Sequence, residues 1–322
     1  MAETDDKYEY LLSIAKATRF GLNHQGLAFQ CRALVEVEEA RKERRSYWHL
    51  AATELPVAVT HGNTHVDFVL DNRIIPWFLV VECKRVDPKS SRWVFAKYPT
   101  TSSSSNHVGL HTSLVSVSDL PGTGSHVEQW RTWASLPHLY NTAFAISSPS
   151  RGQQAGDHAP SGGKDRDAPV KAAQQAIKGM NGLINHWHRF GVERSGTRFV
   201  LPVVVTTAEL WGCDIDLSSA DLATGNVQVA PEHLTKHDWL CLEQNVSTSF
   251  LHDAPVMIPD GGLGVESEAL FTCSCLIVNA NSFGKFLGFL NEDTWLDTGP
   301  RNQSRQAGRW SHTGERYDQR DE

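Results

Sequence analysis

The chain has 322 residues, 40% of them hydrophobic, and its 30 Lys and Arg residues against 37 Asp and Glu residues give a net charge of −7 at pH 7. This length allows one large domain or two small ones, and the apolar content is enough for a sizeable core. The acidic balance argues against a protein that coats nucleic acid non-specifically, but it allows an enzyme with a local basic groove. The six cysteines include no C-x-x-C pair, so they indicate neither a zinc ribbon nor a disulfide framework.

The N-terminal residues are acidic, and no apolar segment reaches the roughly 20 residues that a membrane-spanning helix needs. We therefore expect no membrane contact, and a reducing cytoplasm is the simplest compartment. Cys273 and Cys275 alternate within an apolar run, so both are expected to be packing residues.

Two helices are expected before the first strand. Residues 7–20 have the pattern of a short amphipathic helix, and residues 24–45 that of a longer one whose apolar side contains Leu27, Cys31, Leu34 and Val35. Gln30 and Glu38 fall within that apolar side. A buried polar side chain costs free energy unless it has a partner, so these two residues need a reason to face inward. Gln30 could satisfy this simply by bonding nearby backbone.

Three strand-like runs follow in close succession. Residues 54–61 form the first, and residues 65–71 alternate between apolar and polar side chains. Residues 77–84 are nearly all apolar until their end, as a strand buried on both faces would be. Residues 71–73 supply a turn, so the second and third runs are expected to pair as a hairpin.

The polar end of the third run carries the chemistry. Side chains alternate between the faces of a strand, so Glu82 and Lys84 project from one face, and the hairpin can bring Asp67 beside them. Two carboxylates a few ångströms apart repel, which makes a hard divalent cation their natural partner. Such a cation polarises a phosphoryl group, and a nearby lysine can hold the attacking water or neutralise transition-state charge. The alternative is a cross-strand ion pair between Asp67 and Lys84 with no further role.

Asp67 followed by Glu82-Cys83-Lys84 at the end of a hydrophobic strand resembles the D…(D/E)-x-K signature of the PD-(D/E)xK nucleases, the restriction-endonuclease-like enzymes. The proline that usually precedes the aspartate is Val66 here, and the overall layout resembles uncharacterised bacterial members of this superfamily. The resemblance implies that Asp67 and Glu82 ligate Mg²⁺ or Mn²⁺ and that Lys84 orients or activates water.

The resemblance also implies further polar residues around the metal. The family's first helix often has a G-x-x-F-E pattern whose Glu faces the metal, and this chain has G-L-A-F-Q from Gly26 to Gln30. Gln30 or, two turns later, Glu38 would then complete the pocket. Several branches place a Gln on the helix after the E-x-K strand, and Gln175, in the helix expected over residues 167–188, resembles that position. A solvent-facing glutamine is the alternative.

Residues 86–166 lose the regular pattern and are expected to form a loop-rich insertion, with denser pieces at 91–98 and 127–146. Residues 147–166, rich in Gly, Ser and Pro, are typical of a linker or mobile loop. Cations interleaved with aromatic residues follow the third strand, namely Lys89, Arg92 and Lys97. This composition suits a nucleic-acid-binding groove about as well as an ordinary surface loop.

The remaining elements complete an α/β fold. Strands are expected at residues 199–207, 239–247 and 270–280, and a helix at 281–291. The order resembles a restriction-endonuclease-like core, α-β-β-β-α-β, with a mixed central sheet flanked by helices in one domain over residues 1–296. Residues 297–322 are polar and are expected to be a disordered tail.

The sequence therefore predicts a divalent-metal-dependent nuclease that hydrolyses phosphodiester bonds, with DNA as the favoured substrate. The expected partners are nucleic acid and, in a homodimer, a second copy of the chain. Two alternatives stay open: a catalytically inactive module on the same fold that binds nucleic acid or protein, and an unrelated α/β protein with a structural ion pair. The intact set of Asp67, Glu82 and Lys84 favours the enzyme.

Overall fold

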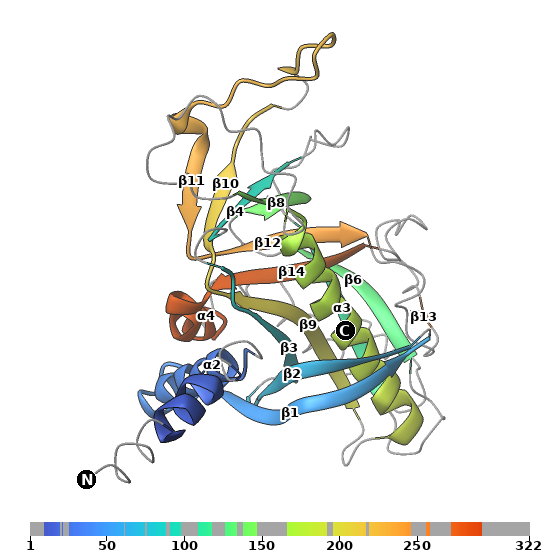
Figure 1. Ribbon diagram of the computed structural model, residues 1–322. Coiled ribbons are helices and arrows are strands. Elements are labelled where there is room, and N and C mark those ends of the chain that lie inside the picture. Colours follow the sequence, from blue (N-terminus) through green and yellow to red (C-terminus); the bar gives the residue numbers. More distant parts are fainter. Residues whose placement is uncertain are drawn as a thin grey trace, which may run out of the picture.

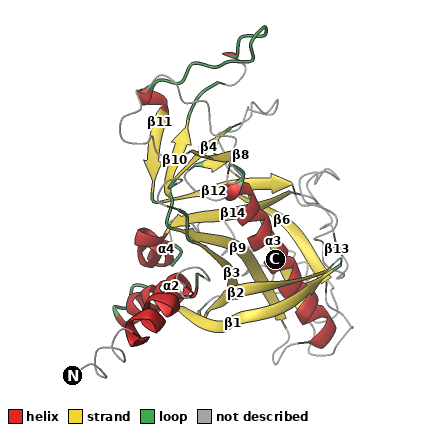
Figure 2. Cartoon of the chain, in the orientation of Figure 1, coloured by secondary structure: helices red, strands yellow, loops and turns green. Residues whose placement is uncertain are grey.

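The structure is a computed structural model that describes residues 10–19, 21, 26–60, 62–74, 76–87, 91–97, 109–117, 126–133, 138–146, 166–191, 196–216, 219–245, 256–257 and 272–291. These residues form a mixed α/β structure in which helices flank a mixed central sheet (Figures 1 and 2). The linker expected at 147–166, apart from its last residue, and the tail expected at 297–322 lie outside the described residues.

The strands that carry the site form an antiparallel meander joined to a parallel strand. β1 (Trp48–Val59), β2 (Gly62–Asn72) and β3 (Trp77–Lys84) pair antiparallel in chain order. β9 (Gly196–Thr206) then pairs with β3 in parallel along the full length of β3. This places the polar end of β3 beside the carboxyl end of β9.

The sheet continues on the other side of β9. β14 (Thr272–Asn279) is parallel to β9, β12 (Trp239–Asn245) is antiparallel to β14, and the short β7 (Leu139–Tyr140) is parallel to β12. The first half of β9 also pairs with β5 (Gly109–Val117). The strand order is therefore β1-β2-β3-β9-β14-β12-β7, with β5 as a branch.

Two further strands extend this branch, and four others form a second sheet. β6 (His126–Trp133) pairs with β5 and with β13 (Val256–Met257). The second sheet has the order β11-β10-β4-β8 and stands above the central sheet in Figure 1. Its strands are β11 (Leu234–His237), β10 (Glu209–Cys213), β4 (Arg92–Ala96) and β8 (Thr142–Ile146).

The segment 86–166 thus contributes β4 to β8, whereas its sequence predicts a loop-rich insertion. The difference has a physical cause, because these strands pair with partners that are remote in the chain. β4, for example, is parallel to β10, with Arg92 opposite Glu209. Strand propensity depends strongly on such neighbours, so a short segment without clear alternation gives little local signal.

Helices cover both faces of the central sheet. α3 (Ala168–Phe190) lies on one face, and α2 (Leu27–Lys42) and α4 (Phe283–Phe289) lie on the other. Two hydrophobic cores result, because successive residues of β3 point to opposite faces: Leu79 and Val81 enter the α2 and α4 core, and Val80 enters the α3 core. The nearly continuous apolar sequence of β3 follows from this double burial.

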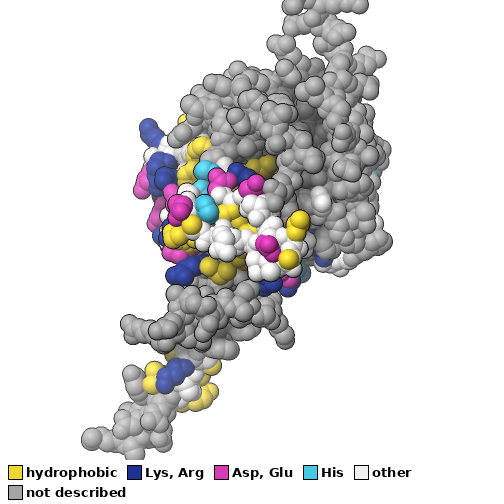
Figure 3. Space-filling view, turned by 90° about the horizontal axis from the view of Figure 1, so that it is seen from above, with side chains coloured by type: hydrophobic (Ala, Val, Ile, Leu, Met, Phe, Trp, Pro, Cys, Tyr) yellow, Lys and Arg dark blue, Asp and Glu magenta, His cyan; other side chains and the backbone are white. Residues whose placement is uncertain are grey.

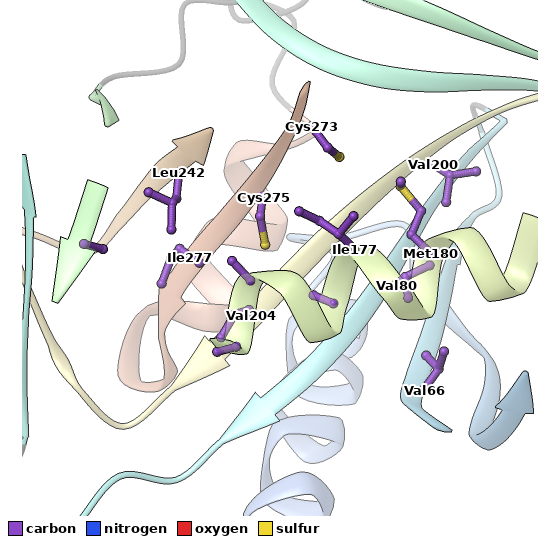
Figure 4. Close-up of a cluster of buried hydrophobic side chains, with 14 of the residues drawn as sticks. Val66, Val80, Ile177, Met180, Val200, Val204, Leu242, Cys273, Cys275 and Ile277 are labelled. Atoms are coloured by element: carbon purple, nitrogen blue, oxygen red, sulfur yellow. The ribbon is translucent and has the colours of Figure 1, made fainter. Parts of the chain in front are cut away.

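Figure 4 shows the core under α3. Ile177 and Met180 of the helix point toward valines of the strands, among them Val80 and Val204. Cys273 and Cys275 are buried in the same cluster, so their prediction as packing residues is confirmed, and all six cysteines of the chain are free thiols. At Gly182 an added Cβ would lie 2.4 Å from the Cγ2 atom of Val57, so glycine lets α3 lie directly on β1.

Most other predicted elements are present. β3 has the predicted bounds, and α3, β9, β12, β14 and α4 differ from prediction by a few residues at their ends. Residues 10–19 are helical, within the short helix expected at 7–20. β1 begins six residues earlier than predicted. In the described part of the chain, no helix combines the length and the apolar character needed to cross a membrane.

Candidate catalytic site

The site lies where the ladder between β2 and β3 ends. The paired residues run from Asp71 and Phe78 to Phe68 and Val81, so the backbone ladder stops before Asp67 and Glu82 are reached. Beyond the last backbone pair, a side chain joins the two strands: the Oδ2 atom of Asp67 accepts a hydrogen bond from the backbone N–H of Cys83 at 2.6 Å. Asp67 is therefore attached to the middle residue of the E-x-K triplet.

Lys84 links the strand to α3. Its Nζ atom lies 2.6 Å from Oε1 of Glu82 and donates to Oε1 of Gln175 at 2.9 Å. Glu82 is 3% exposed, whereas the side chain of Lys84 is 34% exposed. Glu82 follows Val80 by two residues, so it points to the α3 face of the sheet. Four of the predicted site residues, Asp67, Glu82, Lys84 and Gln175, therefore meet under the first half of α3.

Both carboxyl groups are harder to ionise in the metal-free protein than ordinary carboxyl groups are. Burial, and then the charge of Asp67, raises the pKa of Glu82 to about 7, although Lys84 acts in the opposite direction. Burial also raises the pKa of Asp67, against the effects of the Cys83 N–H and of Lys84. The pKa of the Cys83 thiol is raised well above its ordinary value by burial and by both carboxylates, so this thiol stays protonated. The site therefore favours a bound positive charge.

Gln30 supports Asp67 from the opposite face of the sheet. It is 6% exposed on α2, and its Nε2 atom donates to the backbone oxygen of Asp67 at 2.8 Å. Glu38 does not join the site. Its side chain is 44% exposed and pairs with Arg41 at 2.6 Å, a hydrogen bond that lowers the pKa of Glu38. The expectation that Glu38 could face the metal is thus wrong, because the buried side of α2 runs from Gln30 through Ala33, Val37 and Ala40 and leaves Glu38 outside.

The cations expected to bind nucleic acid do not form a uniform basic surface. Lys89 lies outside the described residues. Arg92 lies 3.6 Å from a carboxylate oxygen of Glu209, and Lys97 lies 3.8 Å from one of Asp214. In the view of Figure 3, acidic, basic and histidine side chains of the described residues are interspersed rather than gathered by charge. The prediction for Arg92 and Lys97 therefore gains no support from their surroundings.

Glu54 is an acidic neighbour of the site that the sequence analysis did not single out. The pairs Thr53–Phe68 and Leu55–Val66 leave Glu54 opposite Asp67 on β1. Its charge contributes to the raised pKa of both Asp67 and Glu82. Its φ is 47°, a left-handed conformation that non-glycine residues seldom adopt. Sequence gives no direct sign of this conformation, and an acidic residue at the start of a predicted strand looks like an ordinary surface residue.

The donor set suits a hard divalent cation. Asp67 and Glu82 offer carboxylate oxygens, and Mg²⁺ is usually held by one or two carboxylates together with water and substrate oxygens. Within the described ranges, no group of three or more His, Cys, Asp or Glu side chains is arranged to hold a metal ion. Comparisons with family models, curated proteins and solved structures find no match for this chain.

Proposed function

We propose that the protein is a divalent-metal-dependent nuclease of the PD-(D/E)xK type that hydrolyses phosphodiester bonds in DNA. The observation that carries the proposal is the meeting of Asp67, Glu82 and Lys84 at the end of the β2–β3 ladder, with Gln175 bonded to the lysine. The order of the core elements is compatible with a restriction-endonuclease-like fold: helix α2, the antiparallel strands β1 to β3, helix α3, and β9 parallel to β3.

Asp67 and Glu82 would hold Mg²⁺ or Mn²⁺. The raised pKa of both groups supports this assignment, because the charge of a cation would offset the free-energy cost of ionising two buried carboxyl groups that also have acidic neighbours. Such a metal supplies charge neutralisation at the phosphoryl group and acidifies a bound water. Asp67 depends on its bonds to Cys83 and Gln30 for its position, so these contacts would orient the metal-binding carboxylate.

Lys84 would orient the attacking water and neutralise charge that develops on the phosphate. Two contacts support this role, since Glu82 and Gln175 hold the ammonium group at the partly exposed end of the strand. The arrangement differs from the simple cross-strand ion pair considered as an alternative. Lys84 pairs with Glu82 of its own strand, and Asp67 bonds the backbone of Cys83.

The test is cleavage of labelled plasmid, linear duplex and single-stranded DNA in the presence of Mg²⁺, Mn²⁺ or a chelator. Wild-type protein should cleave at least one substrate only with metal. Lys84→Ala should lose cleavage while it retains its fold, because the lysine charge acts mainly in the transition state. Lys285→Ala is the matched control, since Lys285 is also ion-paired, to Asp238 at 2.9 Å, but lies on α4.

Two outcomes would contradict the proposal. Cleavage by Lys84→Ala at the wild-type rate, with contaminating nucleases excluded, would remove the lysine from the mechanism. DNA binding by wild-type protein without cleavage on any substrate would favour the inactive binding module on the same fold.

A further inference from the structure

A second feature lies beside the proposed catalytic site, between α3 and the tip of the β1–β2 hairpin. The second half of α3 packs across this tip, where Lys178 donates to the backbone oxygen of Asn63 at 3.3 Å and Asn185 donates to that of Ala58 at 3.1 Å. A cleft of about 460 Å³ opens next to these contacts. Its volume is within the range of pockets that bind small molecules or single building blocks of a polymer.

The cleft lies on the same side of α3 as the catalytic residues. His186, in its lining, follows Gln175 by eleven residues, which is three helical turns to within about 20° and about 16 Å along the helix axis. On the strand side, the cleft is lined by Asn63, Thr64 and His65, which precede Asp67 on β2 by two to four residues. A nucleic-acid strand that leaves the catalytic site along α3 therefore reaches the cleft after a few nucleotides of extended backbone.

The chemistry of the lining suits a nucleotide. The rings of His186 and Phe190 are tilted against each other with centroids 5.0 Å apart, and Phe190 is 68% exposed. Arg189 and His65 add nitrogen donors, and the described lining residues include no carboxylate, although the whole chain carries a net charge of −7. Exposed aromatic rings next to cationic groups bind unpaired bases by stacking and the neighbouring phosphates by charge.

We propose that this cleft binds a base of single-stranded nucleic acid a few nucleotides from the phosphate that is cut, with the base on Phe190 and His186 and the backbone toward Arg189. The inference rests on the proposed nuclease function and makes it more specific. A base within a duplex is stacked and paired, so it cannot use the exposed ring. The substrate is therefore a single strand, or a duplex end or branch that supplies one.

Binding in a chelator-containing buffer tests this inference independently of cleavage. The probes are a fluorescent oligothymidylate, an abasic oligomer of the same length and a hairpin duplex, measured by anisotropy against the full-length protein. Wild-type protein should bind the oligothymidylate roughly fivefold or more tightly than the abasic oligomer. Phe190→Ala should lose this preference, and Phe190→Trp should keep it. Tyr47→Ala is the control, because Tyr47 is an exposed aromatic residue in the α2–β1 connection.

A second variant checks the charge contribution. Arg189→Gln should weaken oligothymidylate binding and lower its salt dependence, because it removes one phosphate contact. Thermal melting should show all variants folded.

Three results would contradict base binding in the cleft. Phe190→Ala could retain the preference for oligothymidylate over the abasic oligomer, wild-type protein could bind both oligomers equally well, or the duplex could compete as well as the single strand. Metal-dependent cleavage together with any of these results would leave the nuclease proposal standing and remove only the cleft. Loss of the preference in Phe190→Ala, with no cleavage by wild-type protein, would support the cleft and contradict the nuclease proposal.

Discussion

The carboxyl group of Glu82 should make the metal-free protein less stable as the pH rises to neutral, and Glu82→Gln should abolish that loss. Glu82 has a pKa of about 7 in the folded protein, against an ordinary value of 4.5, because of burial and the charge of Asp67. The difference of about 2.5 pH units between these values corresponds to ~3 kcal/mol of folding free energy.

The direction follows from proton binding. Because the folded protein holds this proton more tightly than the unfolded chain does, the stabilisation is complete below about pH 4.5 and is lost as the pH rises through about 7. Glutamine keeps the shape of the protonated acid at every pH. Glu82→Gln should therefore match wild-type stability at about pH 4.5 and exceed it at about pH 8, by up to ~3 kcal/mol. Loss of the ion pair with Lys84 would reduce this gain.

Urea denaturation in a chelator at both pH values measures the effect. Glu38→Gln is the matched control, because Glu38 is an exposed glutamate on α2 and its pKa is lowered rather than raised, chiefly by its hydrogen bond to Arg41. Saturating Mg²⁺ at the higher pH should stabilise the wild-type protein and leave Glu82→Gln nearly unchanged, since a ligand stabilises only the form that binds it. An equal difference between wild type and Glu82→Gln at both pH values would refute the reasoning.

Three further substitutions examine the surroundings of the site. Asp67→Asn keeps an oxygen that can accept the N–H of the neighbouring strand, so it should retain the fold but lose metal-dependent stabilisation and cleavage, as melting with and without Mg²⁺ would show. Gln30→Ala should lower the free energy of unfolding by ~1–3 kcal/mol in urea denaturation, because it removes a buried hydrogen bond. Glu38→Ala is the control and should change this free energy by less than ~0.5 kcal/mol. Equal effects of the two substitutions would show that Gln30 does not support Asp67. Gly182→Ala should destabilise by ~1–3 kcal/mol, because its Cβ would lie 2.4 Å from a methyl carbon of β1. Gly179→Ala, at 3.1 Å from a methyl carbon of β2, should be milder, and the reverse order would contradict the packing described.

The local sequence predicted those features that depend only on neighbouring residues in the chain. The apolar run ending in Glu82 and Lys84 indicated a doubly buried strand with both charged groups on one face, since strand alternation depends only on the chain itself. The prediction for Gln175 came instead from the resemblance to the PD-(D/E)xK nucleases, several of which place a glutamine on the helix after the E-x-K strand. The structure agrees, because Gln175 bonds Lys84.

Other features depend on contacts that the local pattern does not contain. The apolar side of α2 included both Gln30 and Glu38, and only the docking of that helix on the sheet buries the first and exposes the second. The left-handed conformation of Glu54 and the pairing of β4 with the distant strand β10 have no sign in the local sequence pattern.

By itself, therefore, the sequence determined the set of chemical groups, namely Asp67, Glu82 and Lys84, and the face of β3 from which the last two project. Tertiary structure decided how these groups meet. The β2–β3 ladder ends before Asp67, which leaves the backbone N–H of Cys83 available to the Asp67 carboxylate, and α3 crosses the sheet where Gln175 can reach Lys84. Such geometry follows from the packing of whole elements, whose energies arise from residues far apart in the chain and are not encoded in any one segment.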